Sequence, residues 1–345
     1  MPQLKILAPD DRAANAAWDA YILAHPQATF FHRAGWQRVL GRAFRHACHY
    51  LYTEEAGRIT GVLPLAHVKS LLFGNSLASL PFAVYGGVVA DDAASAELLL
   101  AEAQRLARAL RVDHLELRNL LRTQPDWPEQ DLYVTFRKEI LPDEEANLLA
   151  IPRKQRAMVR KGIKNGLTAT VDPGVERFFA VYADNVHRHG TPAMPKRYFE
   201  ALRAEFGDDC EVLTVCAPDG AVISSVLSFY FRDEVLPYYA GDAEAARDLA
   251  GNDFKYWELM RRSCARGLKV FDYGRSKQGT GSYSFKKNWG FEPQPLHYEY
   301  CLYKHDQVPQ NNPNNAKYKL LIETWRRMPI GLANWLGPFI VRSLG

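Results

Sequence analysis

The sequence contains the same order of predicted elements twice. Residues 49–68 (HYLYTEEAGRITGVLPLAHV) and 210–231 (CEVLTVCAPDGAVISSVLSFYF) each predict a β-hairpin, with tight turns at Gly57 and at Asp219-Gly220. Each hairpin is followed by a predicted aromatic strand that ends in glycine, then by a helix and a short strand. In the first copy the aromatic strand is VYGG at 84–87, the helix is 94–111 and the short strand is 114–119. In the second copy the aromatic strand is PYYAG at 237–241, the helix is 253–267 and the short strand is 269–274. Because the spacings agree and the identities do not, the repeat is one of architecture.

A hairpin followed by strand, helix and strand is a mixed α/β layout, so two copies predict two tandem domains with α+β mixed sheets. The length of 345 residues agrees, since a domain averages about 150 residues. We predict domains at 1–150 and 151–305, the second ending with a helix at 281–290 and a strand at 293–303. Residues 306–315 (DQVPQNNPNN) are rich in turn formers and predict a linker, so that 306–345 forms a linker and helical tail.

The composition is that of an ordinary globular protein, with 47% hydrophobic and 24% charged residues. The net charge of +4 does not by itself indicate nucleic acid. Five scattered cysteines without a C-x-x-C pair argue against a disulfide framework and a structural zinc site, and no metal is expected. Asp10 and Asp11 interrupt the N-terminus before a signal-peptide core forms, and no run of about 18 apolar residues occurs. We therefore expect a cytoplasmic protein.

Residues 281–293 (GSYSFKKNWGFEP) set two lysines among four aromatic side chains and then reach Gly290. The pattern predicts a short amphipathic helix that the glycine ends. Two interpretations stay open: a surface helix with its lysines in water, or a helix that positions Lys286 for chemistry. Lys287, about 100° further round the helix, is expected to face solvent.

A second helix, over residues 153–164, is strongly basic, with six basic residues and no acidic one. Spacings of three and four residues put four of them on one face, while Val159 and Ile163 pack elsewhere. These candidates for binding tRNA or another anion are Arg153, Arg156, Arg160 and Lys164. Because like charges so placed repel, a tRNA phosphate backbone or a sugar-nucleotide diphosphate would stabilise them. A merely solvated face is the alternative.

Six blocks in this order resemble the FemAB family, whose members carry two tandem domains of the GCN5-related (GNAT) acyltransferase fold. The resemblance covers most of residues 25–305. The blocks are FFHRAGWQRVL (30–40), RKQRAMVRKGIKNGLTATV (153–171), KRYFEAL (196–202), PYYAGDA (237–243), FDYGRS (271–276) and SFKKNWGF (284–291). The first resembles the family's strand-and-helix entry and the second its basic helix opening domain two. In detail the chain is most similar to FemAB-like proteins that accompany bacterial exopolysaccharide and PEP-CTERM sorting systems.

The resemblance implies an aminoacyltransferase that moves an amino acid from aminoacyl-tRNA to an amine on a cell-envelope precursor, a peptidoglycan precursor in the family. Charged tRNA would be the co-substrate, and no cofactor is implied. In such a transfer a fixed ammonium stabilises the negative charge that develops on the ester carbonyl oxygen. The family's functional lysine, in an F-K pair, corresponds to Lys286 beside Phe285. Tyr283, Phe285 and Trp289 would shield its charge from water.

The resemblance also implies further site residues. A functional tyrosine on the strand at 237–241 corresponds to Tyr239, although a core tyrosine is an equally good interpretation. Asp272 is a candidate general base, with a turn cap as the alternative. The candidate substrate-binding residues are Tyr198, Arg197, Tyr238, Tyr283, His32 and Arg33. Leu40 occupies the position near which the family can carry a phosphate-binding lysine, so an anionic acceptor other than the peptidoglycan precursor is considered.

Two alternatives come from other functional classes. An acyl-CoA-dependent GNAT N- or O-acyltransferase acting on an exopolysaccharide or envelope sugar would use an R/Q-x-x-G-x-G/A loop to hold the diphosphate. Residues 241–253 (GDAEAARDLAGND) lack that signature and hold four acidic residues against Arg247, and the S-K-Q-G-T-G run at 276–281 follows a different strand. Acyl-CoA is therefore the less expected donor. The other alternative is a non-catalytic binding module, and domain one, which lacks a lysine-aromatic helix, is expected to be a binding platform.

The tail at 317–345 predicts two amphipathic helices separated at Pro329. The first has an apolar stripe, with Lys317, Lys319, Arg326 and Arg327 on other faces, and is expected to pack against domain one. The two stripes consist of Leu320, Leu321, Trp325 and Met328, and of Leu332, Trp335, Leu336, Phe339 and Ile340. For 329–345, contact with the inner face of a membrane and contact with a partner both stay open.

Overall fold

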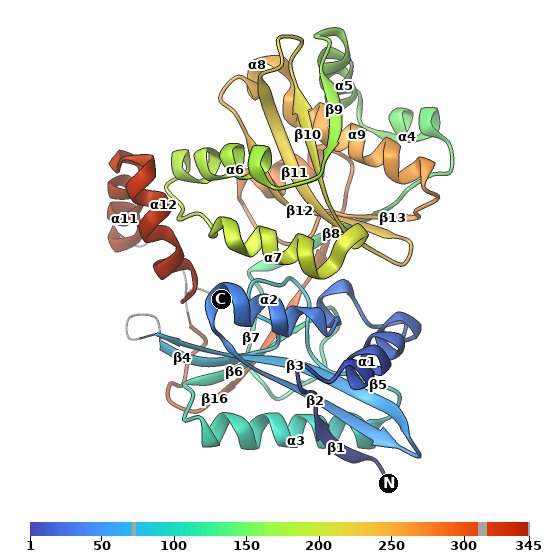
Figure 1. Cartoon of the computed structure of the whole chain (residues 1–345), viewed down its shortest axis with the longest axis vertical. Coiled ribbons are helices and arrows are strands. Elements are labelled where there is room, and N and C mark those ends of the chain that lie inside the picture. Colours follow the sequence, from blue (N-terminus) through green and yellow to red (C-terminus); the bar gives the residue numbers. More distant parts are fainter. Residues whose placement is uncertain (71–73, 310–315, 344–345) are drawn as a thin grey trace. The chain divides into compact units, whose positions relative to one another are not determined.

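The computed structural model describes residues 1–70, 74–309 and 316–343, with side chains in the last range from Leu321 onward (Figure 1). The chain forms two compact units. Unit 1 comprises Met1–Tyr133, a returning segment that begins at Pro295, and the end of the chain from Arg342. Unit 2 comprises Val134–Gln294 and the tail up to Val341. Each unit contains its own mixed sheet, which confirms the predicted fold class. Residues 310–315 of the predicted linker and the side chain of Leu320 lie outside the described residues.

Unit 1 is built on a sheet in the order β1-β2-β3-β4-β6-β16-β7, with β5 paired to β3. The pair β4 and β6 is parallel, whereas the hairpin β2–β3 is antiparallel. Helix α3 packs on β2, β3 and β6, and leucines from these elements form the core. The elements are β1 (Gln3–Ile6), α1 (Arg12–Ala24), η1 (Phe30–His32), α2 (Gly35–Phe44), β2 (Ala47–Glu55), β3 (Arg58–Ser70), β4 (Gly74–Ala78), β5 (Val89–Ala90), α3 (Ala93–Ala109), β6 (His114–Asn119), β7 (Glu129–Gln130) and β16 (His297–Leu302).

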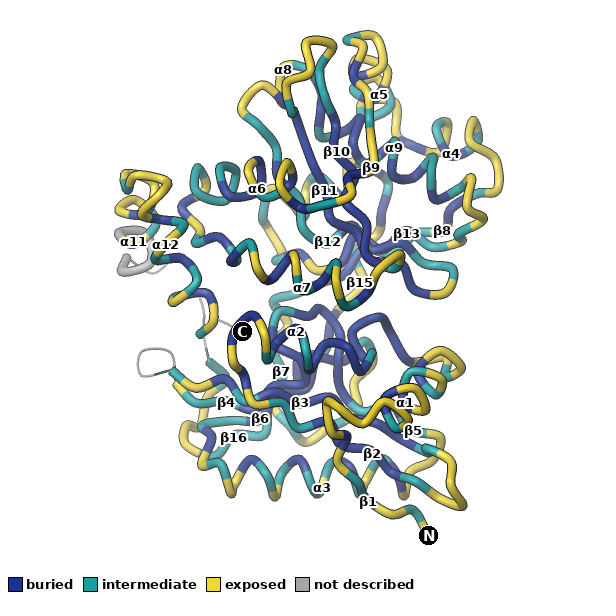
Figure 2. The backbone as a smooth tube through the Cα atoms, viewed as in Figure 1, coloured by how far each residue is buried: buried dark blue, intermediate teal, exposed yellow. Residues whose placement is uncertain are grey.

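Unit 2 has a sheet in the order β14-β8-β13-β12-β11-β10-β9, with β15 paired to β8. Helices α6 and α9 both pack on strands β10–β12, and α5 lies on α9. The central strands are buried along most of their length (Figure 2). The elements are β8 (Tyr133–Glu139), α4 (Glu144–Ala150), α5 (Arg153–Lys164), β9 (Thr168–Asp172), α6 (Glu176–Arg188), α7 (Lys196–Phe206), η2 (Gly207–Asp209), β10 (Cys210–Cys216), β11 (Val222–Phe231), β12 (Glu234–Asp242), α8 (Ala246–Leu249), α9 (Gly251–Ala265), β13 (Val270–Asp272), β14 (Ser276–Lys277), α10 (Gly281–Asn288), β15 (Pro293–Pro295), α11 (Ala316–Arg327) and α12 (Ile330–Val341).

Both predicted hairpins form, as β2–β3 and β10–β11. The first turns at Ala56 and Gly57, whose φ angles of 49° and 76° are both positive, as two-residue hairpin loops require. The second turns at Gly220, with φ of 86°. The helices predicted at 94–111 and 253–267 are α3 and α9, and the strand predicted at 114–119 is β6.

The aromatic stretch VYGG at 84–87 is not a strand, contrary to the prediction. Strand β4 instead precedes it, and the intervening chain is irregular because Leu80 and Phe82 adopt φ angles of 74° and 65°. A Cβ on Gly86 would lie 1.9 Å from Ser79 O, so a glycine is required at this close approach of two backbones. The predicted entry strand near residue 30 is likewise the short 3₁₀ helix η1.

One strand of each sheet comes from an unexpected part of the chain. Strand β16, predicted to end domain two, pairs antiparallel with β6 and β7 in the sheet of unit 1. Strand β8, predicted to belong to domain one, pairs antiparallel with β13 in the sheet of unit 2. The predicted boundary after residue 150 therefore falls inside unit 2, where β8 and α4 precede the basic helix α5.

The tail forms the two predicted helices, which break at Pro329. They pack on α6 of unit 2, as His187 Nε2 meets Met328 O at 2.9 Å and Trp325 is buried. Leu321, predicted to pack, is 62% exposed. Within the described residues, none of the helices has the length and apolar character needed to cross a membrane.

Candidate active site

The candidate site begins where two strands of unit 2 part. Strand β12 pairs with β11 along its length, but its parallel pairing with β13 joins only Glu234 to Val270 and Val235 to Phe271. The register between β11 and β12 shifts between Leu227 and Ser228, which leaves Tyr238 as a bulge residue. Beyond these pairs β13 leads to the turn at 273–275 and to α10, the helix predicted to carry the functional lysine.

Helix α10 has clear signals at both ends. Thr280 caps the N-terminus by accepting a hydrogen bond from Tyr283 N. At the C-terminus Gly290 has φ of 80°, and the N–H groups of Gly290 and Phe291 donate to Lys287 O and Lys286 O. This pair of bonds is a Schellman motif, so the predicted stop at Gly290 is confirmed.

Lys286 points into unit 2, whereas Lys287 is exposed as predicted. The Lys286 side chain donates from Nζ to three backbone carbonyls, of Tyr273 at 2.7 Å, Gly274 at 3.0 Å and Arg275 at 3.1 Å. Its ammonium also lies over the rings of Phe136, at 5.6 Å, and Tyr273, at 5.9 Å. These rings, and not the predicted Tyr283, Phe285 and Trp289, face the charge.

The protonation of Lys286 is set by opposing effects. Burial lowers the pKa of Lys286 to about 7, the Asp272 carboxylate raises this pKa, and the Arg275 guanidinium lowers it. Three carbonyl acceptors favour the ammonium, since only the charged form supplies three N–H donors. The bond to Arg275 O is the longest and lies at the partly exposed edge. A substrate oxygen can therefore replace Arg275 O as acceptor while the other two hydrogen bonds of Lys286 stay buried.

Asp272, the candidate general base, is fully buried. It accepts hydrogen bonds from Gly274 N at 2.7 Å, from Arg137 at 3.1 Å and from Thr135 at 3.4 Å. A carboxylate with these three donors caps a turn and neutralises an arginine. The geometry therefore favours the turn-cap interpretation.

The two tyrosines predicted separately, Tyr198 and Tyr239, lie together. Their hydroxyl oxygens are 3.1 Å apart, which joins α7 to β12. Burial raises the pKa of both hydroxyls well above the usual range, so both are neutral at physiological pH. Tyr239 also packs edge-on against Phe199, with ring centroids 5.2 Å apart, and Tyr238 packs against Phe229 at 5.4 Å. The hydrogen bonds and ring contacts of Tyr239 form a cluster distinct from that of Lys286.

Phe285 and Tyr283 of α10 are packing residues. Phe285 lies 5.6 Å from the ring of Tyr256, and Tyr283 meets Phe136 edge-on at 5.4 Å. Both belong to the partly buried margin of the main core of unit 2. The structure gives Phe285 no polar role, because its neighbours are aromatic rings.

The remaining candidates for substrate binding divide between the units. Arg197 is exposed on α7 of unit 2. His32 and Arg33 belong to unit 1, where His32 Nδ1 accepts a hydrogen bond from Thr29 N and Arg33 lies 3.9 Å from the carboxylate of Asp19. These contacts favour structural roles for His32 and Arg33. Leu40 is fully buried, so its position faces the core of unit 1.

The basic face of α5 is confirmed. Arg153, Arg160 and Lys164 are exposed, and none of the three has a hydrogen bond or ion pair with another described residue. Arg156 is half-buried and donates to Leu149 O at 3.2 Å, at the end of α4. The opposite side of α5 packs on α9 through Val159 and Gly162. Ile163, predicted to pack, is 50% exposed.

Sequence reasoning missed a buried ion pair beside the site. Lys255 of α9 is fully buried and donates to Asp242 at the end of β12, at 2.8 Å, and Ser224 donates to the same carboxylate oxygen. Asp253 accepts a hydrogen bond from Trp289 Nε1 at 2.9 Å, and burial raises its pKa. Two of the four acidic residues at 241–253 thus have structural partners. The available signal was a lysine within the apolar run DFKYWELM.

Comparison with known proteins agrees with the fold described above. Residues 153–287 match the acetyltransferase (GNAT) domain family. The solved structure of FemX superposes with a TM-score of 0.69 at 14% identity, over 88% of this chain and 98% of FemX. This is a tandem GNAT fold. A tandem GNAT protein from the clavulanic acid biosynthesis pathway superposes with a TM-score of 0.57 at 14% identity, over 89% of this chain and all of that one.

Another similar solved structure is the C-terminal domain of a putative lysylphosphatidylglycerol synthetase from Agrobacterium fabrum. It has a TM-score of 0.57 at 14% identity and covers 90% of this chain and 96% of that domain. A search of curated protein sequences finds no match. At these identities the likeness concerns the fold.

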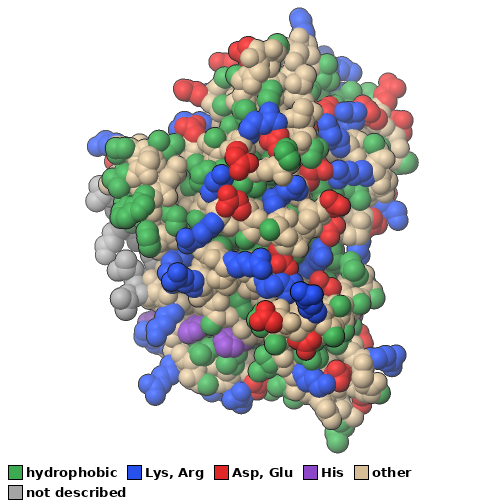
Figure 3. Space-filling view, in the orientation of Figure 1, with side chains coloured by type: hydrophobic (Ala, Val, Ile, Leu, Met, Phe, Trp, Pro, Cys, Tyr) green, Lys and Arg blue, Asp and Glu red, His purple; other side chains and the backbone are tan. Residues whose placement is uncertain are grey.

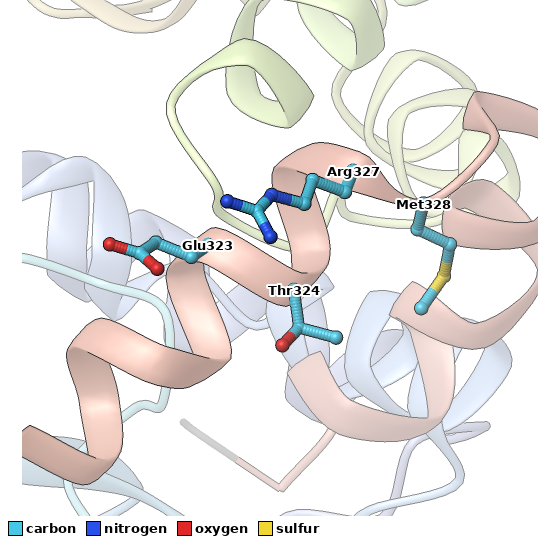
Figure 4. Close-up of a pocket in the computed structure, with 4 residues that line it drawn as sticks. All are labelled: Glu323, Thr324, Arg327 and Met328. Atoms are coloured by element: carbon cyan, nitrogen blue, oxygen red, sulfur yellow. The ribbon is translucent and has the colours of Figure 1, made fainter.

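Two surface pockets have linings that contain none of the candidate site residues. One of about 370 Å³ lies on α11 and is lined by Glu323, Thr324, Arg327 and Met328 (Figure 4). Another of about 440 Å³ lies in unit 1, between Trp127 and the end of β16. Among the described residues, no group of histidine, cysteine and acidic side chains could hold a metal ion.

Proposed function

We propose that this tandem GNAT protein transfers an amino acid from aminoacyl-tRNA to an amine on a cell-envelope precursor. The observation that carries the proposal is the buried Lys286 ammonium, held by the turn that follows β13 and bonded at its partly exposed edge to Arg275 O. The fold resembles that of FemX and that of the C-terminal domain of a putative lysylphosphatidylglycerol synthetase, whose name combines a lysyl group with a lipid. These two likenesses support the choice of reaction. The envelope acceptor would be a peptidoglycan or an exopolysaccharide precursor, the latter if the protein serves a PEP-CTERM system.

The chemistry follows from the charge that the reaction creates. The acceptor amine attacks the ester carbonyl carbon, a C–N bond forms, and the carbonyl oxygen becomes negative. Lys286 would exchange its bond to Arg275 O for a bond to this oxygen and stabilise it in a site shielded from water. The ester C–O bond then breaks, the amine loses a proton, and the ribose oxygen of the tRNA gains one. The hydroxyl of Tyr239 is bonded to that of Tyr198 in a separate cluster, so no step is assigned to it.

The basic face of α5 would bind the tRNA backbone. Its exposed cations Arg153, Arg160 and Lys164 lack acidic partners in the described part of the chain, so they are available to phosphates. The first turn of α9, where an acyl-CoA enzyme would hold a diphosphate, carries Asp253. A carboxyl group there opposes a second anion, which favours tRNA over acyl-CoA as donor.

A charge-reversal experiment tests the role of α5. We expect Arg153→Glu with Arg160→Glu to weaken tRNA binding and to lower the slope of log K against log salt by about one for each lost phosphate contact. Arg58→Glu, at an exposed arginine of the first hairpin, is the matched control and should leave the slope unchanged. Filter binding over a range of salt concentrations measures both. An unchanged slope in the double variant would remove α5 from the tRNA site.

A transfer assay separates the three functional classes. Purified protein is mixed with an amine-bearing envelope precursor and either tRNA charged with a labelled amino acid or labelled acetyl-CoA. We expect label on the precursor from charged tRNA. Label from acetyl-CoA alone would establish the acyl-CoA alternative, and precursor binding without any transfer would establish the binding-module alternative.

A further inference from the structure

Helix α12 carries several of its large apolar side chains outward. Its buried residues are small or of moderate size, namely Ala333, Gly337 and Val341, at steps of four residues. A Cβ on Gly337 would lie 3.1 Å from Ala193 O, so this face approaches the backbone of unit 2 closely. In an ordinary surface helix the large apolar residues face the core and the polar ones face water. In α12 the bulky Leu332, Trp335 and Phe339 are exposed, while Leu336 and Ile340 are half-buried.

The outer apolar face consists of Leu332, Trp335 and Phe339 of α12, at steps of three and four residues. Trp335 is 65% exposed and Phe339 61%, and their ring centroids are 5.9 Å apart. Leu332 is 45% exposed. Figure 3 shows hydrophobic side chains gathered over the α11–α12 region. Single exposed apolar residues are common, but a contiguous group marks a contact surface.

The charged residues next to this face in the sequence are almost all positive. Residues 328–341 contain no Asp, Glu, Lys or Arg. Exposed Arg326 and Arg327 precede α12, and exposed Arg342 follows it directly. Glu323 is the one acidic residue in 321–343. An apolar face with tryptophan, bordered by arginines, fits the boundary between acyl chains and anionic headgroups.

We propose that α12 lies in the interface of a membrane that contains anionic lipids, with its outer apolar face inserted and the arginines at the headgroups. The helix has 12 residues and is about 18 Å long, which suits lying in the interface and not crossing the bilayer. A second copy of the chain fits less well, because a twofold contact would bring the arginines near their own copies. Three side chains are also far fewer than the roughly 20 residues per side of a stable interface. The proposal does not depend on the enzymatic function.

Vesicle sedimentation tests the membrane proposal with the full chain. We expect the protein to sediment with vesicles of equal parts phosphatidylcholine and phosphatidylglycerol, and less with phosphatidylcholine alone. Trp335→Ser with Phe339→Ser should weaken vesicle binding by about tenfold or more, because each substitution removes a large apolar side chain that would be buried in the lipid. Leu23→Ser with Leu121→Ser, at exposed leucines far from the tail in sequence, is the matched control and should bind like the wild type.

Three outcomes would overturn the proposal. The first is absence of wild-type binding to either vesicle, and the second is a double variant that binds as well as the wild type. The third outcome is evidence that the face makes protein contacts. It would be either a wild-type dimer in solution that is a monomer in the double variant, or a clear fall in the melting temperature of that variant. Either result would assign the outer apolar face to protein packing. An unchanged melting temperature with lost vesicle binding supports the membrane contact.

Discussion

Lys286→Met is expected to lower the rate of aminoacyl transfer by about 10²- to 10³-fold, the effect of removing one donor to a developing oxyanion. Methionine keeps much of the side-chain volume beside Phe136 and Tyr273 but removes the charge and the three N–H donors. The rate is measured in a single turnover with charged tRNA, so that donor binding and chemistry separate. Lys287→Met, at the exposed neighbour, is the matched control and should keep the wild-type rate.

The pH dependence of the rate distinguishes catalysis from packing. Since the pKa of Lys286 is lowered to about 7, the ammonium is present below that pH and is lost above it. Above pH 7 the charged fraction, and with it the contribution of Lys286, should fall about tenfold per pH unit. Lys286→Arg stays charged, so any activity that it retains should lack this fall. A wild-type rate that does not fall above pH 7, with near-normal activity of Lys286→Met, would leave the lysine with a purely structural role in the turn at 273–275.

The local elements of this fold could be predicted because their signals are local. The turn at Gly57 and the end of α10 at Gly290 depend on residues that adopt positive φ. The helices α3 and α9 were predicted from the spacing of their apolar residues. The strand at 84–87 could not be assigned correctly. Its aromatic and apolar residues suit a strand, but contacts with β6 and with Ser79 hold the backbone in irregular form.

The assignment of strands to sheets could not be predicted from local pattern. Strands β8 and β16 each have a sequence typical of any strand, and no feature within them names a partner. β16 pairs with β6, more than 170 residues earlier in the chain, as in the pair His297 and Asn119. Domain boundaries drawn from the order of elements therefore misplace both strands.

The candidate site was predicted in part. Lys286 and the basic face of α5 came from the resemblance and from spacing. The structure buries Lys286 and exposes three of the four cations of α5, and their functional roles stay predictions. The pairing of Tyr198 with Tyr239 was not predicted, because the two lie on elements whose packing is a tertiary property. Lys255 was missed because a lysine in a helix is usually solvated, and its burial depends on Asp242 at the end of another element.

The second large effect is expected at this buried ion pair. Asp242→Ala should lower the free energy of unfolding of unit 2 by about 3–5 kcal/mol, because it leaves the Lys255 ammonium buried without a counter-charge. Lys255→Met should cost less, since the Asp242 side chain is 29% exposed and keeps the hydroxyl donor of Ser224. Combining the two should cost less than their sum, with a coupling of about 1–3 kcal/mol. Asp248→Ala, at an exposed carboxylate of the short helix α8, is the control and should change stability by less than about 0.5 kcal/mol.

Urea unfolding followed by circular dichroism measures the four variants. We expect Asp242→Ala to cost more than Lys255→Met because the Lys255 side chain is fully buried, whereas the Asp242 side chain is partly exposed to water at the end of β12. Stability that is equal for Asp242→Ala and Asp248→Ala would mean that the Lys255 ammonium finds water or another acceptor. Simple additivity of the Asp242 and Lys255 variants would mean that the two charges do not interact. If the pair is as strong as its burial indicates, it fixes the end of β12 against α9 and so holds the strand that carries Tyr239 in place.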